Sequence, residues 1–526
     1  MRSREWFAFW ILMWGVASAR AGSDPYTCAG PAEAKVRNGV DEAVFAQLAE
    51  RGLRPAVLCS DGVFLRRLYL DVLGTLPTEE EARRFLTDDR PDKREAWIEE
   101  VLAREEWAEY QAMKWSELLR LKAEYPVNLW PNAAQAYHGW IRDAFRQNLF
   151  YDRFARALLT ASGSNFRDPA VNFYRAVPSR DPVGIARAVA LTFMGVRWER
   201  CPSNQWAGVA ACFAGVSYKP TGEWKEEIVF HDPQSPHVRQ WWGELGRVRM
   251  PDGAVIECGR MEDPRPRFAD WLIRPENPWF GACVANRVWS WLMGRGIVHE
   301  PDDFRPDNPP SNPVLLRYLT SELVASGYDL KHLYRVILRS HTWQQSCVPA
   351  VTAAVAAEAF ACYPVRRLEA EVLLDALNQV TGGGDSYTST IPEPWTVLPA
   401  GTRAVRIPDG SISSPFLELF GRSPRDTGLE SERNLRHTAA QRLQLLNSTQ
   451  VLRKIEQSPL VRWAAGRGRR VEEVAERFYL VVLSRLPEPE EDAVVERLFA
   501  ESRSRREAAE DFLWALINSA EFVHRH

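Results

Sequence analysis

The chain has 526 residues, too many for one ordinary hydrophobic core, so two or three packed units are expected. Hydrophobic residues make up 45% of it, which is typical of a globular protein and excludes a disordered chain. The formal net charge of -3 provides no basic field, and we therefore expect no nucleic-acid partner.

Residues 1–21 have the pattern of a secretory signal peptide. Two arginines precede an apolar run over residues 6–16, and small residues follow at 17–21. This order predicts cleavage after Ala19 or Ala21. An uncleaved anchor is the alternative, although the run is too short to span a bilayer comfortably. No second apolar run of spanning length follows. We expect an exported protein of the periplasm or cell surface that is not an integral membrane protein.

The predicted N-terminal helical domain covers residues 34–214. Helical periodicity is found in four of its stretches: residues 41–51, 64–73, 94–119 and 130–159. Thr78, with Glu81 three residues later, predicts a capping box at the start of a further helix. Many of the 21 tryptophans fall on such helices, where core packing is the favoured interpretation. The alternative, a platform for sugar rings, fits pairs such as Trp241-Trp242.

A small β-containing insertion is predicted over residues 215–263. Residues 226–230 favour a strand, and residues 247–250 and 254–258 flank the turn sequence Pro251-Asp252-Gly253, which predicts a hairpin. The fold class is therefore mainly α, with two helical domains separated by this insertion.

The second helical domain is predicted over residues 264–526. Helices are indicated at residues 278–293, after Asn312 and after Asp329, the last two residues being N-caps. A minor strand is expected at residues 402–407.

An internal repeat joins the two ends of the chain. RLYLDVLGTLPTEEEARRFL begins at Arg67, and RFYLVVLSRLPEPEEDAVVERL begins at Arg477. Each is followed by an Arg-Glu-Ala helix. The repeat predicts one helical hairpin used twice. A duplicated binding surface is the alternative.

These motifs also carry a family resemblance. FLRRLYLDVLGTLPTEEEARRFL in the first half, with NRVWSWLMGRGIVHEPDDF and GYDLKHLYRVILRSHTWQQS in the second, resembles a two-domain bacterial family known mainly from planctomycetes. Its domains are called the planctomycete cytochrome-associated and planctomycete surface domains, unknown-function domains fifteen-forty-nine and fifteen-fifty-three. The resemblance implies no reaction. Many relatives carry a C-x-x-C-H haem motif, whereas Cys201 here has neither a cysteine two residues away nor an adjacent histidine, so no covalent haem and no cofactor are expected.

The eight cysteines are dispersed, and spacing does not determine their pairing. An oxidising compartment permits disulfides. The candidates closest in sequence are Cys28 with Cys59 and Cys201 with Cys212.

The predicted ligand-binding residues are charged side chains of the second domain: Arg287, Asp303, Arg366, Arg367, Glu369, Arg425, Asp426 and Glu432. Arg287 lies on an otherwise apolar helix and needs a carboxylate partner, for which Asp303, Glu369 and Asp426 are candidates. A structural ion-pair network is the alternative for the whole set. The connector at residues 299–308 carries oxygen and imidazole groups that suit a cation, but helix capping is favoured, and no metal site is predicted.

No standard catalytic motif occurs in the chain. The sequence therefore favours an exported binding or assembly protein without catalytic activity, with another envelope protein or a polysaccharide as its partner. The alternative is an exported enzyme or accessory factor that acts on polysaccharide.

Overall fold

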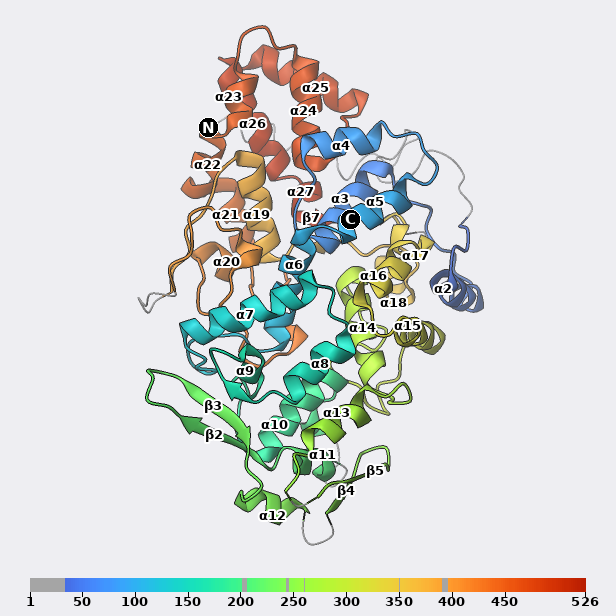
Figure 1. The fold of residues 1–526 in the computed structure, drawn as a ribbon. Helices are drawn as coiled ribbons and strands as arrows, with labels where there is room; N and C mark the ends of the chain where they lie inside the picture. Colours follow the sequence, from blue (N-terminus) through green and yellow to red (C-terminus); the bar gives the residue numbers. More distant parts are fainter. Residues whose placement is uncertain (1–33, 201–205, 243–245, 260, 350, 390–395) are drawn as a thin grey trace.

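The computed structural model describes residues 34–200, 206–242, 246–259, 261–349, 351–389 and 396–526. The fold is mainly α, with 55% of residues in helices and 6% in strands, as the sequence predicts (Figure 1). The predicted signal peptide lies outside the described residues. Among the helices that are described, none has the length and apolar character needed to cross a membrane.

The N-terminal part consists of helices that follow the predicted periodicity. They are α2 (Gly39–Glu50), α3 (Asp61–Val72), α4 (Glu79–Leu86), α5 (Lys93–Leu102), α6 (Glu105–Leu118), α7 (Pro131–Arg146) and α8 (Tyr151–Leu159). The predicted capping box is present, because Thr78 Oγ1 accepts from the Glu81 N–H and the Glu81 carboxylate accepts from the Thr78 N–H. Trp107 and Trp115 on α6 are buried, which supports their interpretation as core residues.

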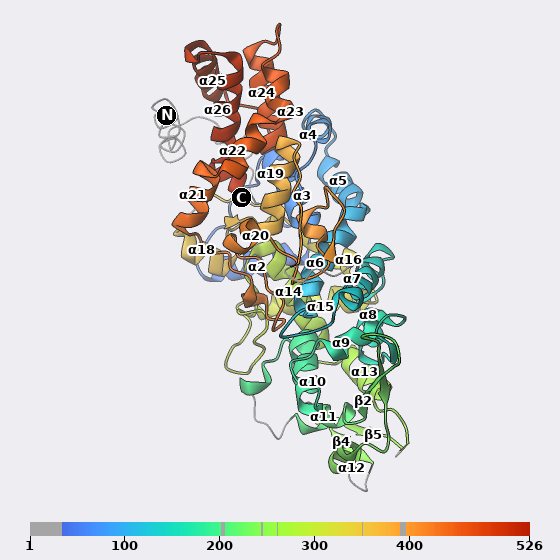
Figure 2. The same cartoon turned by 90° about the vertical axis from the view of Figure 1, so that its left-hand side faces the viewer.

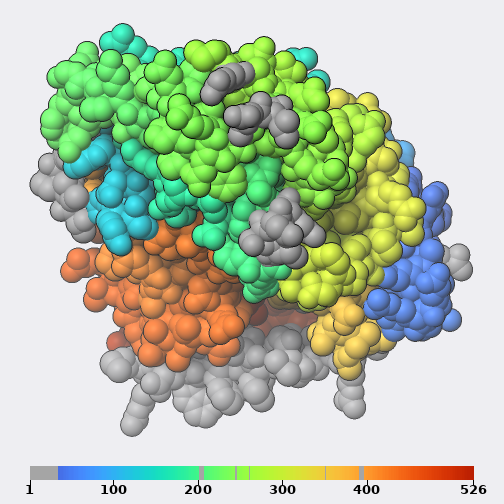
Figure 3. Space-filling view, turned by 90° about the horizontal axis from the view of Figure 1, so that it is seen from below, coloured from blue at the N-terminus to red at the C-terminus, as the bar shows by residue number. Residues whose placement is uncertain are grey.

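The middle of the chain contains short helices and the strands. The helices are α9 (Asn172–Arg175), α10 (Pro182–Val189), α11 (Ala207–Cys212), α12 (Pro236–Trp242) and α13 (Arg265–Ile273). Strands β2 (Val216–Pro220) and β3 (Glu227–His231) form an antiparallel pair, to which β1 (Gly163–Ser164) adds a third strand. The predicted hairpin is β4 (Arg247–Arg249) with β5 (Val255–Glu257). In the view from below, the β-containing segment is green and covers one side of the molecular surface that faces the viewer (Figure 3).

Helices α14 (Phe280–Met293), α15 (Pro313–Ala325) and α16 (Leu330–Leu338) confirm the predictions for this stretch. Asn312 and Asp329 cap the last two of these helices, each through a side-chain oxygen. Two short helices, α17 (His341–Gln344) and α18 (Ala353–Ala359), follow them.

The C-terminal part begins with strand β6 (Arg366–Arg367) and ends with strand β7 (His524–Arg525), which pair with each other. The helices between them are α19 (Ala370–Thr381), α20 (Pro415–Leu419), α21 (Ala439–Asn447), α22 (Thr449–Glu456), α23 (Pro459–Ala464), α24 (Val471–Leu483), α25 (Pro489–Glu501), α26 (Arg505–Ile517) and α27 (Ala520–Val523).

The strand predicted at residues 402–407 is wrong. Residues Ala404–Arg406 form a 3-10 turn instead. The Asp375 carboxylate accepts hydrogen bonds from the N–H groups of Ala404 (2.6 Å) and Val405 (3.1 Å). These two groups are therefore not available to a strand partner.

The two copies of the repeat have the same local packing and touch each other. Helix α3 packs on α4 and α5, as α24 packs on α25 and α26. Helix α4 also packs against α24, where Arg477 Nε donates to the Glu79 carboxylate at 2.9 Å. The blue and red helices accordingly lie side by side at one end of the molecule (Figures 1 and 2).

The described residues contain two hydrophobic cores, and each combines distant parts of the chain. The first core runs from Val40 to Tyr363, across the β-containing segment, and also includes Leu480 of the C-terminal part. The second runs from Leu368 to Phe522 and also takes in four residues of the N-terminal part: Leu70, Leu76, Tyr110 and Met113. Each core therefore needs residues from both ends of the chain.

Candidate functional site

Arg287 is fully buried, and its carboxylate partner is Asp302 rather than any of the three candidates named from the sequence. Its Nη2 and Nε donate to Asp302 Oδ1 at 2.7 and 3.2 Å. Its other N–H groups donate to the carbonyl oxygens of Leu191 and Thr192 in the N-terminal part. Helix α14 is thus joined by one side chain to the connector that follows it and to residues 191–192.

Glu430 extends this contact to the loop after α20. Its N–H donates to Asp302 Oδ2 at 2.7 Å, and its Oε1 accepts from Trp291 Nε1 at 2.9 Å. Burial, reinforced by the negative charge of Asp302, raises the pKa of Glu430 to about 7. Glu430 was not predicted as a site residue, because its acidic partner is 128 residues away in the sequence.

A second buried network surrounds β7. Arg525 pairs with Glu369 and with Asp71, whose Oδ1 lies 3.3 Å from Arg525 Nη1. Arg366 Nη2 donates to the same Asp71 oxygen at 3.1 Å. Burial opposes ionisation of Glu369, but the charges of Arg525 and Lys114 outweigh it and hold the pKa of this carboxyl well below its usual value. The network ties α3 to both ends of the C-terminal part.

A third buried network lies at the start of α19. Glu371 pairs with Arg433 at 2.7 Å and with Arg422 at 3.3 Å, and Arg433 also pairs with Glu117 of α6. Despite burial, the neighbouring Arg433 lowers the pKa of Glu371. These contacts connect α6, α19 and the loop after α20 without any recognisable local motif.

The remaining predicted residues have separate partners. Arg367 donates to the carbonyl oxygens of Phe420 and Asn434, and Arg425 donates to those of Ile407 and Pro408. Asp303 pairs with Arg200 and Arg305, Asp426 with Lys122, and Glu432 accepts from the N–H groups of Asp426 and Thr427.

The structure therefore places the eight predicted residues in several networks rather than around one opening. None of them lines either of two pockets found in the described residues. Their role in ligand binding stays a prediction. In the connector, no three His, Cys, Asp or Glu side chains gather as a metal site, and the same holds for the rest of the described ranges.

The disulfide candidates also stay predictions. Cys28 and Cys201 lie outside the described residues. Their proposed partners, Cys59 and Cys212, are buried. The Cys212 thiol donates to the Gly208 carbonyl at 3.4 Å. The exposed-platform alternative for Trp242 is weakened, since its indole N–H donates to the Ala211 carbonyl and its ring packs, partly buried, against the first core.

A polar pocket lies where α4, α6 and α19 meet, and we call it the junction pocket. Its volume is about 390 Å³, within the size range of ligand sites. It is lined by side chains and glycines from both halves of the chain: Thr75, Leu76, Thr78, Glu81, Arg104, Glu106, Asp375, Asn378, Gln379, Gly383, Gly384, Gly401, Thr402 and Arg403.

The pocket is held together by bonds between its two sides. Thr75 Oγ1 donates to Gln379 Oε1 at 2.9 Å, and Gln379 Nε2 donates to the Leu76 carbonyl at 3.0 Å. Arg403 Nη2 reaches back to the Gly74 carbonyl at 3.1 Å. The distance between the two sides is therefore fixed by side chains that also line the space.

The carboxylates of the pocket differ in their ionisation. Burial raises the pKa of Asp375 to about 6, although two backbone N–H groups and Arg403 act in the opposite direction. Hydrogen bonding from Arg104 lowers the pKa of Glu106. For Glu81, burial is outweighed by bonds from Thr78 and by Arg104, so its pKa is also lowered. Near neutral pH the pocket presents two ionised acids beside one that titrates.

Sequence reasoning missed the junction pocket. The capping box at Thr78 predicts the start of a helix and no pocket. The three consecutive glycines at residues 382–384 were the other available signal, because they leave backbone exposed in an irregular stretch.

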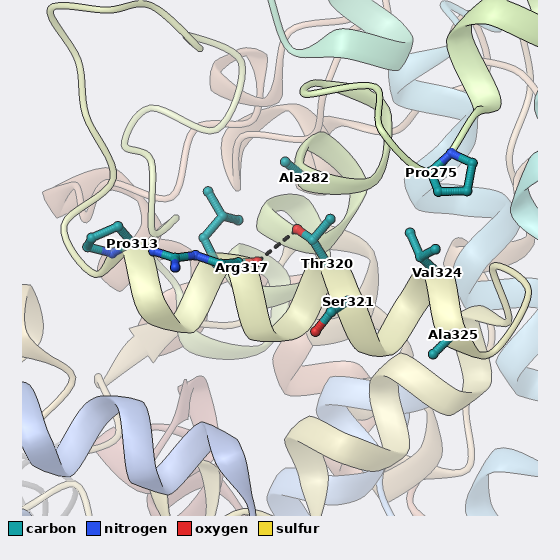
Figure 4. A pocket seen from close by; sticks show the side chains of 9 residues that line it. Pro275, Ala282, Pro313, Arg317, Thr320, Ser321, Val324 and Ala325 are labelled. Carbon is teal, nitrogen blue, oxygen red and sulfur yellow. Dashed lines mark hydrogen bonds between the residues drawn. The ribbon is translucent and has the colours of Figure 1, made fainter.

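A second, larger groove runs along α15 and is mainly apolar. Its volume is about 580 Å³, and it lies between Pro275 at one end and Pro313 at the other (Figure 4). Thr320, which lines it, is turned back to its own helix, since Oγ1 donates to the Leu316 carbonyl at 2.7 Å. The groove collects no set of convergent polar groups, unlike the junction pocket.

Two family models match the chain. The model PSCyt2, described as a protein of unknown function (DUF1549), matches residues 39–199. The model PSD1, described as a protein of unknown function (DUF1553), matches residues 264–499. The β-containing segment lies between the two matches. The comparisons with curated proteins and with solved structures found no match.

Proposed function

This chain belongs to the two-domain family of proteins of unknown function DUF1549 and DUF1553, and from that premise we propose a binding function for it. In this proposal the protein is exported to the cell envelope, holds a hydroxyl-rich ligand such as a unit of a polysaccharide in the junction pocket, and does not transform it. No cofactor takes part.

The observation that carries the proposal is the origin of the pocket lining. Thr75 to Glu106 fall within the segment matched by one family model, and Asp375 to Arg403 fall within the segment matched by the other. The pocket therefore exists only when both domains are present. A ligand site at such a junction gives a physical reason for the two domains to occur in one chain.

The lining favours a neutral ligand with many hydroxyl groups. Three threonines, an asparagine and a glutamine provide neutral donors and acceptors, and carboxylates and guanidinium groups accept from or donate to hydroxyls. The three acids outnumber the two arginines, which disfavours an anion. The glycines leave backbone groups within reach of a ligand.

Binding is favoured over catalysis by the groups that the pocket contains. None of its lining residues is a serine, cysteine, histidine or lysine, the commonest side-chain nucleophiles and bases. Both Asp375 oxygens already accept a backbone N–H. The acid that titrates near neutral pH therefore has a structural role in the turn at residues 404–406.

One observation favours a second candidate, an enzyme that cleaves polysaccharide. Glycoside hydrolysis uses one carboxyl group that holds a proton and another that is ionised. Asp375, with a pKa of about 6, and Glu106, with a lowered pKa, have these opposite tendencies in one pocket.

The test of binding uses a substitution that fills the pocket. A Cβ added at Gly384 meets only the Gly401 Cα, at 3.7 Å, which is ordinary van der Waals contact, so we choose Gly384→Leu. The matched control is Gly222→Leu, where no atom lies within 4 Å of the added Cβ. Calorimetry with neutral oligosaccharides should show binding that Gly384→Leu weakens at least tenfold and Gly222→Leu leaves unchanged. Equal affinity of Gly384→Leu and the unsubstituted chain would exclude the junction pocket.

The same incubations separate the two candidates. Chromatography of the recovered oligosaccharide should show no shorter products after prolonged contact with the protein. Cleavage that is abolished in Asp375→Asn would establish the enzyme instead.

Export has its own test. N-terminal sequencing of the protein from the cell envelope should give a chain that begins at Arg20 or Gly22. A chain that begins at Met1 and stays in the cytoplasm would remove the cell-envelope part of the proposal and leave the binding part intact.

A further inference from the structure

Two histidines from distant parts of the chain face each other beside the C-terminal strand. His437 lies just before α21, and His524 lies in β7, opposite Arg367 of β6. Their Nε2 atoms are 3.3 Å apart, and their ring centroids are 5.0 Å apart with 42° between the ring planes. The contact is exposed to solvent.

From this geometry we propose that His437 and His524 form a binding site for a zinc-like divalent transition-metal ion. Zinc binds imidazole nitrogen at about 2.0–2.1 Å, and two such nitrogens in a tetrahedral site stand about 3.3 Å apart. The observed distance between the two Nε2 atoms equals this nitrogen-to-nitrogen distance. The rings need only turn until both lone pairs converge on one point beside the line that joins them.

The surroundings of His524 suit a metal ligand. Its Nδ1 lies 2.7 Å from the Ala520 carbonyl oxygen, and only a protonated Nδ1 makes that contact favourable. The lone pair is then on Nε2, on the side of His437. A ligating histidine usually donates its other ring N–H to such an acceptor, which fixes the ring orientation.

The alternative is a hydrogen bond between two imidazoles and nothing more. Positive groups stand close to the pair: burial, followed by the charges of Arg367 and Arg442, lowers the pKa of His437. The same two arginines act on His524, where burial is again the main cause. The neutral imidazole is the form that binds metal, whereas the arginine charges repel a cation. Arg367 is already engaged with the carbonyl oxygens of Phe420 and Asn434.

The ligand class follows from the donor set. Two imidazoles suit zinc, nickel or copper, whereas magnesium and calcium prefer oxygen ligands. In the part of the chain that the structure describes, no third His, Cys, Asp or Glu completes a metal cluster. Two coordination positions are therefore left for water or for a group from another molecule, and the affinity should be moderate.

The experiment uses the full chain, purified without a polyhistidine tag and freed of metal. Titration calorimetry with zinc chloride should show one site of moderate affinity, and magnesium chloride should show none. The His437→Gln substitution, on an exposed residue before a helix, should weaken zinc binding at least tenfold and leave the melting temperature unchanged. The matched control is His237→Gln, a substitution of an exposed histidine in α12, which should bind zinc as the unsubstituted chain does.

His524→Gln provides the second variant and should give the same loss as His437→Gln. Nickel, followed by X-ray absorption, should report two imidazole ligands in the unsubstituted chain. The proposal is overturned if no zinc binds, or if His437→Gln binds zinc as tightly as the unsubstituted chain. In either case the pair is a hydrogen bond between side chains only.

Discussion

At the scale of single residues, Arg287 is the clearest case of a charge that depends on the whole fold. It has no exposed surface, and its donors go to Asp302 and to two carbonyl oxygens. Arg287→Ala should lower the free energy of unfolding by about 3–5 kcal/mol, because it leaves the Asp302 carboxylate buried without its cation. The midpoint of urea unfolding measures this loss.

Arg339 is the matched control for that substitution. It pairs with Glu99 at 3.1 Å, but 42% of its side chain is exposed. Arg339→Ala should therefore cost less than about 1 kcal/mol. Equal and small shifts for the two variants would contradict the buried role of Arg287.

Glu430 predicts a dependence of stability on pH. Its pKa is about 7 in the folded chain, above the usual value for a glutamate, so the folded state binds the proton more tightly than the unfolded state. Stability should then fall as pH rises from about 4.5, and the loss should be complete above about pH 7. Glu430→Gln removes this loss, since an amide does not ionise and its oxygen still accepts from Trp291.

The measurement compares melting temperatures at pH 5 and pH 8. The difference in the free energy of unfolding between Glu430→Gln and the unsubstituted chain should shift in favour of the variant by about 1–3 kcal/mol between pH 5 and pH 8. Glu418→Gln, on an exposed residue of α20, should show no such difference. An identical pH profile for Glu430→Gln and the unsubstituted chain would contradict the raised pKa of this carboxyl group.

At the scale of elements, helix α4 depends on its capping box. Thr78→Ala removes the acceptor for the Glu81 N–H and should cost about 1 kcal/mol. Thr87→Ala, at the other end of the same helix, removes hydroxyl bonds to the Arg83 and Arg84 carbonyl oxygens of an exposed turn and should cost less than about 0.5 kcal/mol. Chemical denaturation of both variants distinguishes them. A larger loss for Thr87→Ala would show that the cap does not stabilise this helix.

The repeat explains how elements from the two ends of the chain come to pack together. In each copy the first helix packs on the two that follow. The two copies then meet through α4 and α24, where Arg83 pairs with Glu476 and Arg477 pairs with Glu79. These pairs are between partly exposed side chains and add specificity rather than much stability.

At the scale of the whole molecule, the composition of the two cores predicts that the N-terminal and C-terminal halves of the chain do not fold independently. Leu70, Leu76, Tyr110 and Met113 are buried in the second core, and Arg525 pairs with Asp71 of α3. Residues 34–263 and 264–526, expressed separately, should each lack a cooperative unfolding transition, because each exposes apolar surface that the other covers.

Co-expression of the two segments should recover them as one complex. The complex should unfold in a single transition close to that of the full chain, as followed by circular dichroism. Two separate cooperative transitions from the isolated segments would contradict the shared cores.

The sequence by itself determined the local structure of this protein. Helix periods, the caps at Thr78, Asn312 and Asp329, and the hairpin turn at residues 251–253 depend on neighbours within a few positions. It also showed that Arg287 needs a carboxylate partner, because an arginine on an apolar helix cannot be buried alone. The strand expected at residues 402–407 failed because a distant aspartate takes up its N–H groups.

Only the tertiary structure decided which charges meet and where the chain is hollow. Asp302 rather than Asp303 faces Arg287, a choice between adjacent residues that depends on the path of the connector. The junction pocket joins residues that are hundreds of positions apart, and His437 and His524 are 87 positions apart. The spacing of charged and polar side chains along the sequence does not reveal such distant partners. The partners are determined in the folded chain, because a buried polar group that is left unpaired costs free energy.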